Sequence, residues 1–129
     1  MPAASAKKKI LVVEDEPDYR IILREVLGKA GFVVVDAATG EAGLELYRTE
    51  SPDLVLLDVM LPDMTGFEIC EKIRKGKVRP LTPILFCTAR SAVSQLAKGV
   101  KLGGTDYVIK PFVTEDLLAR VRAALQTPP

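Results

Sequence analysis

The chain contains 129 residues, of which 48% are hydrophobic and 27% charged, and its formal net charge is +1. This length and composition are typical of a single globular domain, and a charge so close to zero argues against a general attraction to nucleic acids or membrane surfaces. Two cysteines are too few for a disulfide framework, and the absence of histidine excludes histidine-ligated zinc and any catalysis by a histidine of this chain.

Short apolar runs alternate with segments of helical periodicity along the whole chain. Near-continuous apolar runs are typical of buried parallel strands, and five of them occur, at residues 10–13, 32–35, 54–57, 84–87 and 107–109. Apolar residues three and four positions apart predict helices between the strands, at residues 18–30, from residue 40, at 67–75, more weakly at about 92–102, and at 114–125. Asp18 and Thr39 are the expected N-caps of the first two helices.

Strands that alternate with helices of this length predict an α/β fold in which helices cover both faces of a parallel sheet. We assign residues 1–8 to an N-terminal lead-in, 9–126 to one domain, and 127–129 to a C-terminal tail or the start of a linker. No apolar stretch approaches the ~20 residues of a membrane span, and the N-terminus lacks the apolar core of a signal peptide. We therefore expect a cytoplasmic protein with no membrane contact.

Polar residues follow four of the predicted strands at the point where each strand ends. Glu14 and Asp15 follow the first strand, and Asp58 follows the third. Thr88 follows the fourth strand, and Lys110 follows the fifth. Because the carboxyl ends of parallel strands meet at one edge of the sheet, we expect three carboxylates, a hydroxyl and an ammonium group to converge there. Each residue alone is most often a helix cap or a turn residue, but four matching strand ends are improbable by chance.

This combination of groups predicts a site for a phosphoryl group and a divalent cation. Two like charges ~4 Å apart repel by about 4 kcal/mol at an effective dielectric near 20, so three clustered acids need a lysine and a cation nearby. Mg²⁺ prefers oxygen ligands, which Glu14, Asp15, Asp58 and a backbone carbonyl just past Asp58 offer. A carboxylate can also attack phosphorus to form an aspartyl phosphate, whose oxygens hydroxyl and ammonium donors then neutralise.

Four motifs together resemble the receiver domain of two-component response regulators, over residues 9 to about 125. The motifs are Ile10-Leu11-Val12-Val13-Glu14-Asp15-Glu16, Leu56-Leu57-Asp58-Val59-Met60-Leu61-Pro62-Asp63-Met64-Thr65-Gly66, Thr88-Ala89-Arg90 and Tyr107-Val108-Ile109-Lys110-Pro111-Phe112. The resemblance implies a flavodoxin-like (βα)5 fold with a five-stranded parallel sheet in the strand order 2-1-3-4-5. It also implies a phosphorylation-dependent signalling switch, in which Asp58 accepts a phosphoryl group from a phosphohistidine of a sensor histidine kinase or a histidine phosphotransfer protein.

The resemblance further implies the roles of the site residues. Mg²⁺ is expected to bind Asp58 and Asp15, Glu14 directly or through water, and the backbone carbonyl of Met60. Thr88 and Lys110 are expected to contact the phosphoryl group. Such a domain catalyses only its own phosphorylation and dephosphorylation, so we do not expect an enzyme that acts on other substrates.

Tyr107 takes the position of the aromatic switch residue of this family, and Lys110-Pro111 takes that of its usual cis peptide. We expect the hydroxyl of Thr88 to move towards a phosphoryl group and the ring of Tyr107 to enter the space that it leaves. The face formed by residues Ser91–Leu102 and Tyr107 would then bind an output protein or domain that offers acidic or apolar groups.

The stretch between Thr88 and Thr105 contains no acidic residue, whereas relatives that form DNA-binding dimers usually carry acids there. We therefore expect a monomer or a weak phosphorylation-dependent dimer, with no direct nucleic-acid binding by this domain. The alternative is that the chain is the N-terminal receiver portion of a longer DNA-binding or enzymatic response regulator.

Two other functions fit the sequence less well. A Mg²⁺-dependent aspartyl phosphohydrolase would need a second acid two residues after Asp58, where Met60 cannot transfer protons. A flavin carrier of the same fold would need a phosphate-binding loop after the first strand, where the four acids among residues 14–18 would repel the flavin phosphate.

Overall fold

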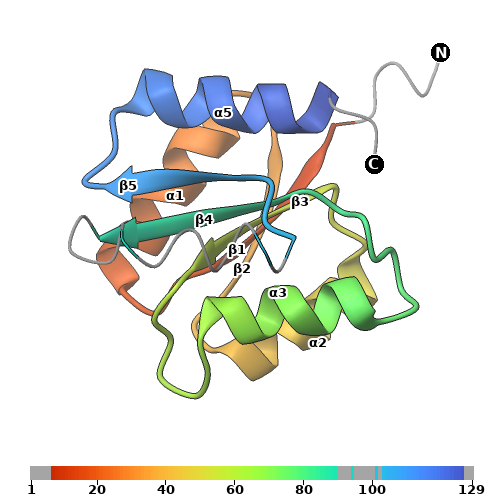
Figure 1. Ribbon diagram of the computed structural model, residues 1–129. Coiled ribbons are helices and arrows are strands. Elements are labelled where there is room, and N and C mark those ends of the chain that lie inside the picture. Colours follow the sequence, from red (N-terminus) through yellow and green to blue (C-terminus); the bar gives the residue numbers. More distant parts are fainter. Residues whose placement is uncertain (1–6, 90–93, 95–100, 102, 127–129) are drawn as a thin grey trace, which may run out of the picture.

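Five parallel strands form the centre of the structure (Figure 1). The computed structural model describes residues 7–89, 94, 101 and 103–126. Within this part of the chain the strands are β1 (Lys9–Val13), β2 (Val33–Ala37), β3 (Leu54–Asp58), β4 (Ile84–Ala89) and β5 (Asp106–Lys110). They lie in the order β2-β1-β3-β4-β5, and every neighbouring pair is parallel. The predicted flavodoxin-like α/β fold with strand order 2-1-3-4-5 is confirmed.

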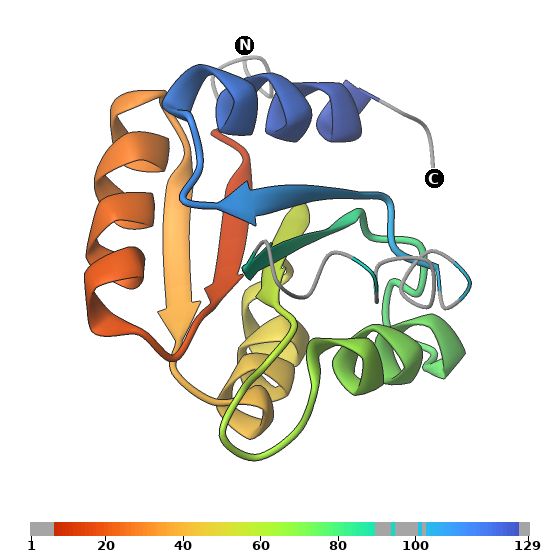
Figure 2. The same ribbon diagram turned by 60° about the vertical axis from the view of Figure 1, so that its left-hand side comes forward.

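Helices cover both faces of the sheet. The helices α1 (Pro17–Lys29) and α5 (Thr114–Gln126) pack on one face, and α2 (Gly40–Glu50) and α3 (Gly66–Lys75) pack on the other (Figure 2). The helix predicted at about residues 92–102 lies outside the described residues, except for positions 94 and 101. Among the helices that are described, none is long and apolar enough to span a bilayer.

The first helix begins differently from the prediction. Its N-cap is Glu16 rather than Asp18, because Pro17 occupies the first helical position, where its fixed φ suits the helix and its missing N–H would have no partner. Asp18 lies in the first turn instead, where its charge interacts favourably with the positive end of the helix dipole. The predicted cap of α2 is confirmed, since the hydroxyl of Thr39 accepts a hydrogen bond from the amide of Ala42 (3.1 Å).

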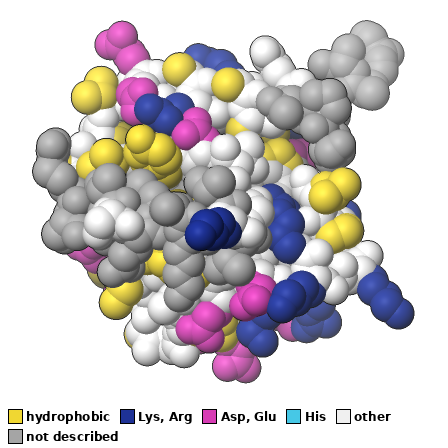
Figure 3. Space-filling view, in the orientation of Figure 1, with side chains coloured by type: hydrophobic (Ala, Val, Ile, Leu, Met, Phe, Trp, Pro, Cys, Tyr) yellow, Lys and Arg dark blue, Asp and Glu magenta, His cyan; other side chains and the backbone are white. Residues whose placement is uncertain are grey.

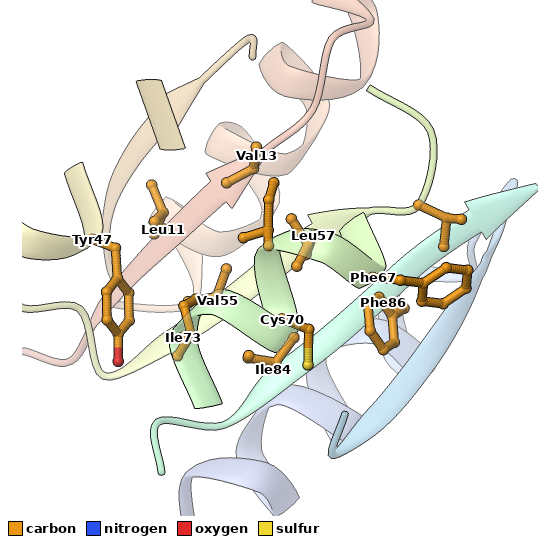
Figure 4. Packing of buried hydrophobic residues seen from close by; sticks show 12 residues of the cluster. Leu11, Val13, Tyr47, Val55, Leu57, Phe67, Cys70, Ile73, Ile84 and Phe86 are labelled. Atoms are coloured by element: carbon orange, nitrogen blue, oxygen red, sulfur yellow. The ribbon is translucent and has the colours of Figure 1, made fainter. Parts of the chain in front are cut away.

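The strands carry apolar side chains on both faces, so the sheet separates two hydrophobic cores. On the side of α2 and α3, the rings of Phe67 and Phe86 meet edge to face with their centroids 5.2 Å apart, and Tyr47 lies at the other end of the cluster (Figure 4). Cys87 is a free, buried thiol whose pKa burial raises to about 12, so it acts as a small hydrophobic residue. Full burial of a leucine or phenylalanine stabilises a fold by about 1.5–3 kcal/mol, and the two cores therefore fix the positions of the strand ends.

Charged side chains of both signs are interspersed on the surface around α3 (Figure 3). Lys75 pairs with Glu71 one turn earlier in this helix (2.8 Å). Exposed pairs of this kind stabilise a fold by roughly 0–1 kcal/mol. On this face, positive charge is accompanied by negative charge, in agreement with the small net charge of the chain.

Gly66 allows the loop after β3 to return close to the end of that strand. A side chain at this position would overlap the backbone oxygen of Asp58. The amide of Gly66 also donates a hydrogen bond to the backbone oxygen of Val59 (2.7 Å). The start of α3 is therefore held directly against the last residue of β3.

We expect Gly66→Ala to lower the free energy of unfolding by about 2 kcal/mol, because a backbone atom cannot move aside for the added methyl group. Gly28→Ala is the matched control, since Gly28 lies within α1 and an added Cβ there has no atom within 4 Å. Alanine should stabilise that helix by roughly 0.5–1 kcal/mol. Urea denaturation followed by circular dichroism measures both changes, and a loss of stability that is equal in the two variants would contradict the close approach at Gly66.

Candidate functional site

The residues predicted at the strand ends lie at one edge of the sheet. Glu14 follows β1, Asp58 ends β3 and Lys110 ends β5. Successive side chains of a strand point to opposite faces of the sheet. Each of these three residues stands two positions after a buried residue that packs against α1 and α5, so each is expected to point to that same face. In the strand between them, Cys87 is aligned with Asp58, so Thr88 stands one residue further along and belongs to the other face.

The ammonium group of Lys110 joins three carboxylates. Its Nζ lies 2.6 Å from Glu14 Oε1 and 3.3 Å from Asp58 Oδ2. A third carboxylate oxygen, Glu16 Oε1, also lies at 3.3 Å. The ring of Tyr19 has its centroid 4.6 Å from Nζ, and the negative face of such a ring attracts a cation. Three carboxylates thus face one ammonium, and the fully ionised group has an excess of negative charge.

Burial and charge act in opposite directions on the pKa values of this group. Burial raises the pKa of Glu14 to about 7 and raises the pKa of Asp58 above its ordinary value, and the positive charge of Lys110 reduces both shifts. Burial alone would lower the pKa of Lys110, but its contact with Glu14 and the charge of Asp58 outweigh this effect and raise the pKa. Lys110 therefore stays positively charged, whereas ionisation of the buried carboxylates has a cost in free energy.

The carboxylates provide the ligand atoms of a cation site. One oxygen from each of Glu14, Glu16 and Asp58 lies within 4.8 Å of the other two. Glu14 Oε1 is buried, and its partner among the described residues is the ammonium group of Lys110 at 2.6 Å. A hard divalent cation such as Mg²⁺ prefers oxygen ligands and would offset the excess negative charge. The residues present therefore fit such an ion.

Glu16, and not Asp15, joins the carboxylate cluster. Asp15 is exposed, and its backbone oxygen accepts a hydrogen bond from the guanidinium of Arg20 (3.3 Å). Residues two apart in extended backbone point to the same side, and the extended conformation of Glu16 (φ −80°, ψ 116°) places its side chain near that of Glu14. Sequence analysis did not single out Glu16 or Tyr19. The spacing of two from Glu14 to Glu16 and of one helical turn from Glu16 to Tyr19 is the signal that could have identified them.

The backbone after Asp58 turns back towards its carboxylate. The amide of Met60 donates a hydrogen bond to Asp58 Oδ1 (3.2 Å), whereas the side chain of Met60 is largely exposed. At the end of β5, the Lys110–Pro111 peptide bond is cis, as the resemblance implies. Met60 and Lys110 therefore approach Asp58 from two different strand ends.

Thr88 and Tyr107 share the face of the sheet opposite to the carboxylates. Tyr107 is aligned with Phe86 in the neighbouring strand, and Thr88 stands two residues after Phe86. Thr88 is buried, and its hydroxyl lies 3.5 Å from the backbone oxygen of Ala89, at the outer limit for a hydrogen bond. Tyr107 is partly buried, with the guanidinium carbon of Arg120 5.1 Å from its ring centroid.

Comparison with known proteins identifies the family. The sequence model of the response regulator receiver domain matches residues 10–122, and the chain therefore belongs to the receiver domain family of two-component response regulators. Response regulators interact with histidine kinases and output domains, and phosphorylation and Mg²⁺ are general features of their receiver domains. Receiver domains are signalling modules rather than conventional enzymes.

The chain is similar both to longer transcriptional regulators and to single receiver domains. It is 45% identical over 118 residues to the transcriptional activator protein IrlR of Burkholderia pseudomallei, a match that covers 92% of this chain and 50% of that protein. It spans about half the length of the curated relatives that it matches.

Solved structures give the same result. A CheY-like response regulator receiver domain protein from Methanospirillum hungatei matches with a TM-score of 0.86 and 31% identity, over 93% of this chain and 94% of that one. The receiver domain of a sensor histidine kinase from Pseudomonas aeruginosa matches with a TM-score of 0.86 and 25% identity, over 95% of this chain and 100% of that one. The latter structure has a magnesium ion coordinated in its active-site cleft.

Asp58→Asn should stabilise the chain in the absence of divalent cations, because it removes one of three carboxylates that share one ammonium. The substitution removes the repulsion between Asp58 and the other two carboxylates, and it also removes the attraction between Asp58 and Lys110. We expect the first effect to be larger, so that the free energy of unfolding rises by about 1–2 kcal/mol. Asp36→Asn is the control, since Asp36 pairs with Arg20 (3.6 Å) and Arg24 (2.9 Å) and the same substitution there should destabilise slightly. Urea denaturation in EDTA measures both, and a destabilised Asp58→Asn would show that the negative charge is not in excess.

Proposed function

We propose that this chain is a phosphorylation-dependent signalling switch whose phosphoacceptor is Asp58. The observation that supports this most strongly is the buried contact between Asp58 and Lys110, 3.3 Å apart at the carboxyl edge of the sheet. The donor is a phosphohistidine of a sensor histidine kinase or of a histidine phosphotransfer protein. A carboxylate oxygen of Asp58 attacks the phosphorus, the P–N bond breaks as the O–P bond forms, and the electron pair of the P–N bond stays with the imidazole nitrogen.

Lys110 and Thr88 hold the transferred group. The phosphoryl oxygens carry negative charge that must be neutralised during transfer. Lys110 Nζ already lies within hydrogen-bond distance of Asp58 Oδ2, so a small movement brings it to a phosphoryl oxygen. The Thr88 hydroxyl, whose described contact with Ala89 is long, loses little when it turns to donate a second hydrogen bond.

We assign the Mg²⁺ ligands to Asp15, Asp58, the backbone carbonyl of Met60, and Glu14 directly or through water. When bound, the ion supplies positive charge that offsets the phosphoryl oxygens. Glu14 and Asp58, which are buried and share a carboxylate cluster, support their part of this assignment, and the magnesium ion of the similar Pseudomonas receiver domain supports the choice of metal. Glu16 is a further candidate ligand, because its side chain shares the cluster.

Thr88 and Tyr107 transmit the state of Asp58 to the output surface. When the hydroxyl of Thr88 turns towards the phosphoryl group, it leaves space on the face that it shares with Tyr107, and the ring moves inward. The alignment of Tyr107 with Phe86 supports this route, since it places the ring two residues along the sheet from Thr88. We expect the output protein or domain to bind the face that residues Ser91–Leu102 and Tyr107 are predicted to form, of which the structure describes positions 94 and 101 and Tyr107.

The alternative remains that residues 9–126 are the N-terminal receiver portion of a longer DNA-binding or enzymatic response regulator. The curated relatives that the chain matches are about twice its length and are named as transcriptional regulators. For the domain by itself we propose a monomer, or a weak dimer after phosphorylation, without nucleic-acid contact. Asp106 and Asp116 support this, because they already pair with Arg120 of the same chain (2.7 and 3.2 Å).

Acetyl phosphate with Mg²⁺ should add one phosphoryl group to the chain, which intact-mass spectrometry measures. Asp58→Asn should abolish the addition, because an amide lacks the nucleophilic oxygen anion. Asp53→Asn is the matched control, since Asp53 precedes the same strand at its other end and hydrogen-bonds the amide of Lys9. It should be labelled like the wild type. Efficient labelling of Asp58→Asn at another residue would overturn the assignment.

Substitution of Asp15 and of Glu16, one at a time, tests which of the two acids binds Mg²⁺ directly. Asp15→Ala should weaken Mg²⁺ binding by about tenfold, which corresponds to the loss of about 1.4 kcal/mol from a direct anionic ligand. Glu16→Ala should weaken it by about two- to threefold, because a more distant charge is lost. Isothermal titration calorimetry measures both constants. The reverse order would assign the direct ligand to Glu16, the residue that the structure places in the carboxylate cluster.

A further inference from the structure

The loop after the phosphoacceptor strand rests with its tip on the start of α2. Asp63 makes this contact, since its Oδ1 accepts a hydrogen bond from the amide of Gly40 (2.8 Å) and its Oδ2 accepts one from the amide of Glu41 (2.9 Å). The first amides of a helix have no partner within the helix, and an anion there interacts favourably with the helix dipole. The two amides hold the pKa of Asp63 below its ordinary value.

A second contact at the same place shows that the loop tip is closely packed. A side chain at Gly40 would overlap the side chain of Met64, so the absence of a Cβ at the first residue of α2 allows the loop to approach. Asp63 and Met64 are adjacent in the loop, and both meet α2 at Gly40. The tip is therefore docked by a polar and an apolar contact together.

The base of the loop is also fixed, and it carries the groups that surround the phosphoacceptor. Met60 and Thr65 form an isolated antiparallel bridge, and Gly66 packs against the backbone oxygen of Asp58. The amide of Met60 donates to Asp58 Oδ1 (3.2 Å). Any movement of the tip that shifts Met60 therefore changes the orientation of the reacting carboxylate.

We infer that Asp63 is a positioning residue, which fixes the backbone of Met60 and the carboxylate of Asp58 for phosphoryl transfer by anchoring the loop on α2. The inference rests on the proposed function of Asp58 as phosphoacceptor. Asp63 itself is exposed and touches no reacting atom. It acts through the four residues of loop that separate it from Asp58, and a displacement of about 1 Å at a reacting centre can slow a reaction by up to about a hundredfold.

The test compares Asp63→Ala with Thr39→Ala. Both substitutions remove a cap from the same end of α2, because the hydroxyl of Thr39 accepts a hydrogen bond from the amide of Ala42 (3.1 Å). Only Asp63 belongs to the loop. Asp63→Asn retains one acceptor oxygen for the two amides and should restore part of the anchor. Thermal unfolding of the three variants confirms that each is folded and that the two alanine variants lose similar stability.

Two measurements then distinguish a role of Asp63 in positioning the loop from a role in stabilising α2. In the absence of Mg²⁺, amide hydrogen exchange at Met60 and Gly66 should accelerate by about tenfold in Asp63→Ala and remain unchanged in Thr39→Ala. At saturating Mg²⁺, labelling by acetyl phosphate should slow by about tenfold in Asp63→Ala, by less in Asp63→Asn, and by less than about twofold in Thr39→Ala.

The outcomes distinguish this inference from the proposed function. Suppose that the wild-type chain is labelled at Asp58, and that Asp63→Ala and Thr39→Ala show the same labelling rate and the same exchange rates of the loop amides. The positioning role of Asp63 is then overturned, and the assignment of Asp58 as phosphoacceptor stands. If the wild-type chain is not labelled, the proposed function is overturned and the positioning role with it. Slower labelling in Asp63→Ala together with faster exchange at Met60 supports the role.

Discussion

The ammonium group of Lys110 is the interaction on which the candidate site depends. Neighbouring strands lie about 4.8 Å apart, so β5 and β3 are separated by roughly 10 Å, with β4 between them. β4 presents small residues on the face concerned, since Ala89 is aligned with Lys110 and Cys87 with Asp58, so the lysine side chain meets little bulk as it crosses. By reaching across, Lys110 allows Glu14 and Asp58 to be buried as a group. The negative charge that it leaves uncompensated is what would attract a divalent cation to the site.

Close packing around this charged group limits the movement of the chain after Asp58. Gly66 approaches the backbone of Asp58, and the capping box of Thr65 and Glu68 starts α3 directly after the loop. A nucleophile that is already oriented needs less reorganisation during reaction. The loop is thus short and anchored at both ends, which suits the role proposed for Asp58 as phosphoacceptor.

The sequence predicted the strand ends because buried parallel strands leave a simple apolar signature, and because such ends meet at one edge of a sheet. The sequence analysis was less accurate at the start of the first helix. Pro17 shifted the start of α1, so that Glu16 became the N-cap in place of Asp18. Glu16, in extended backbone two residues after Glu14, also joins the carboxylate cluster, and the prediction from strand ends did not include it.

Contacts between distant segments could not be predicted from a pattern. Asp63 meets Gly40, 23 residues earlier, and no local periodicity links a loop tip to the start of another helix. The Tyr19 ring lies beside Lys110, from a position 91 residues earlier in the chain. Such contacts follow from the strand order and the packing of helices, and they became visible only in three dimensions.

The sheet also places the residues of the candidate site on two separate faces. Lys110 and the carboxylates project from the face that α1 and α5 cover, whereas Thr88 and Tyr107 lie on the opposite face. Adjacent residues of β4, Cys87 and Thr88, belong to one face each. Substitutions in α1 or α5 therefore act on the side of the sheet that carries Lys110 and the carboxylates, and substitutions in α2 or α3 act on the side of Thr88 and Tyr107, so that the two sides can change separately in sequence.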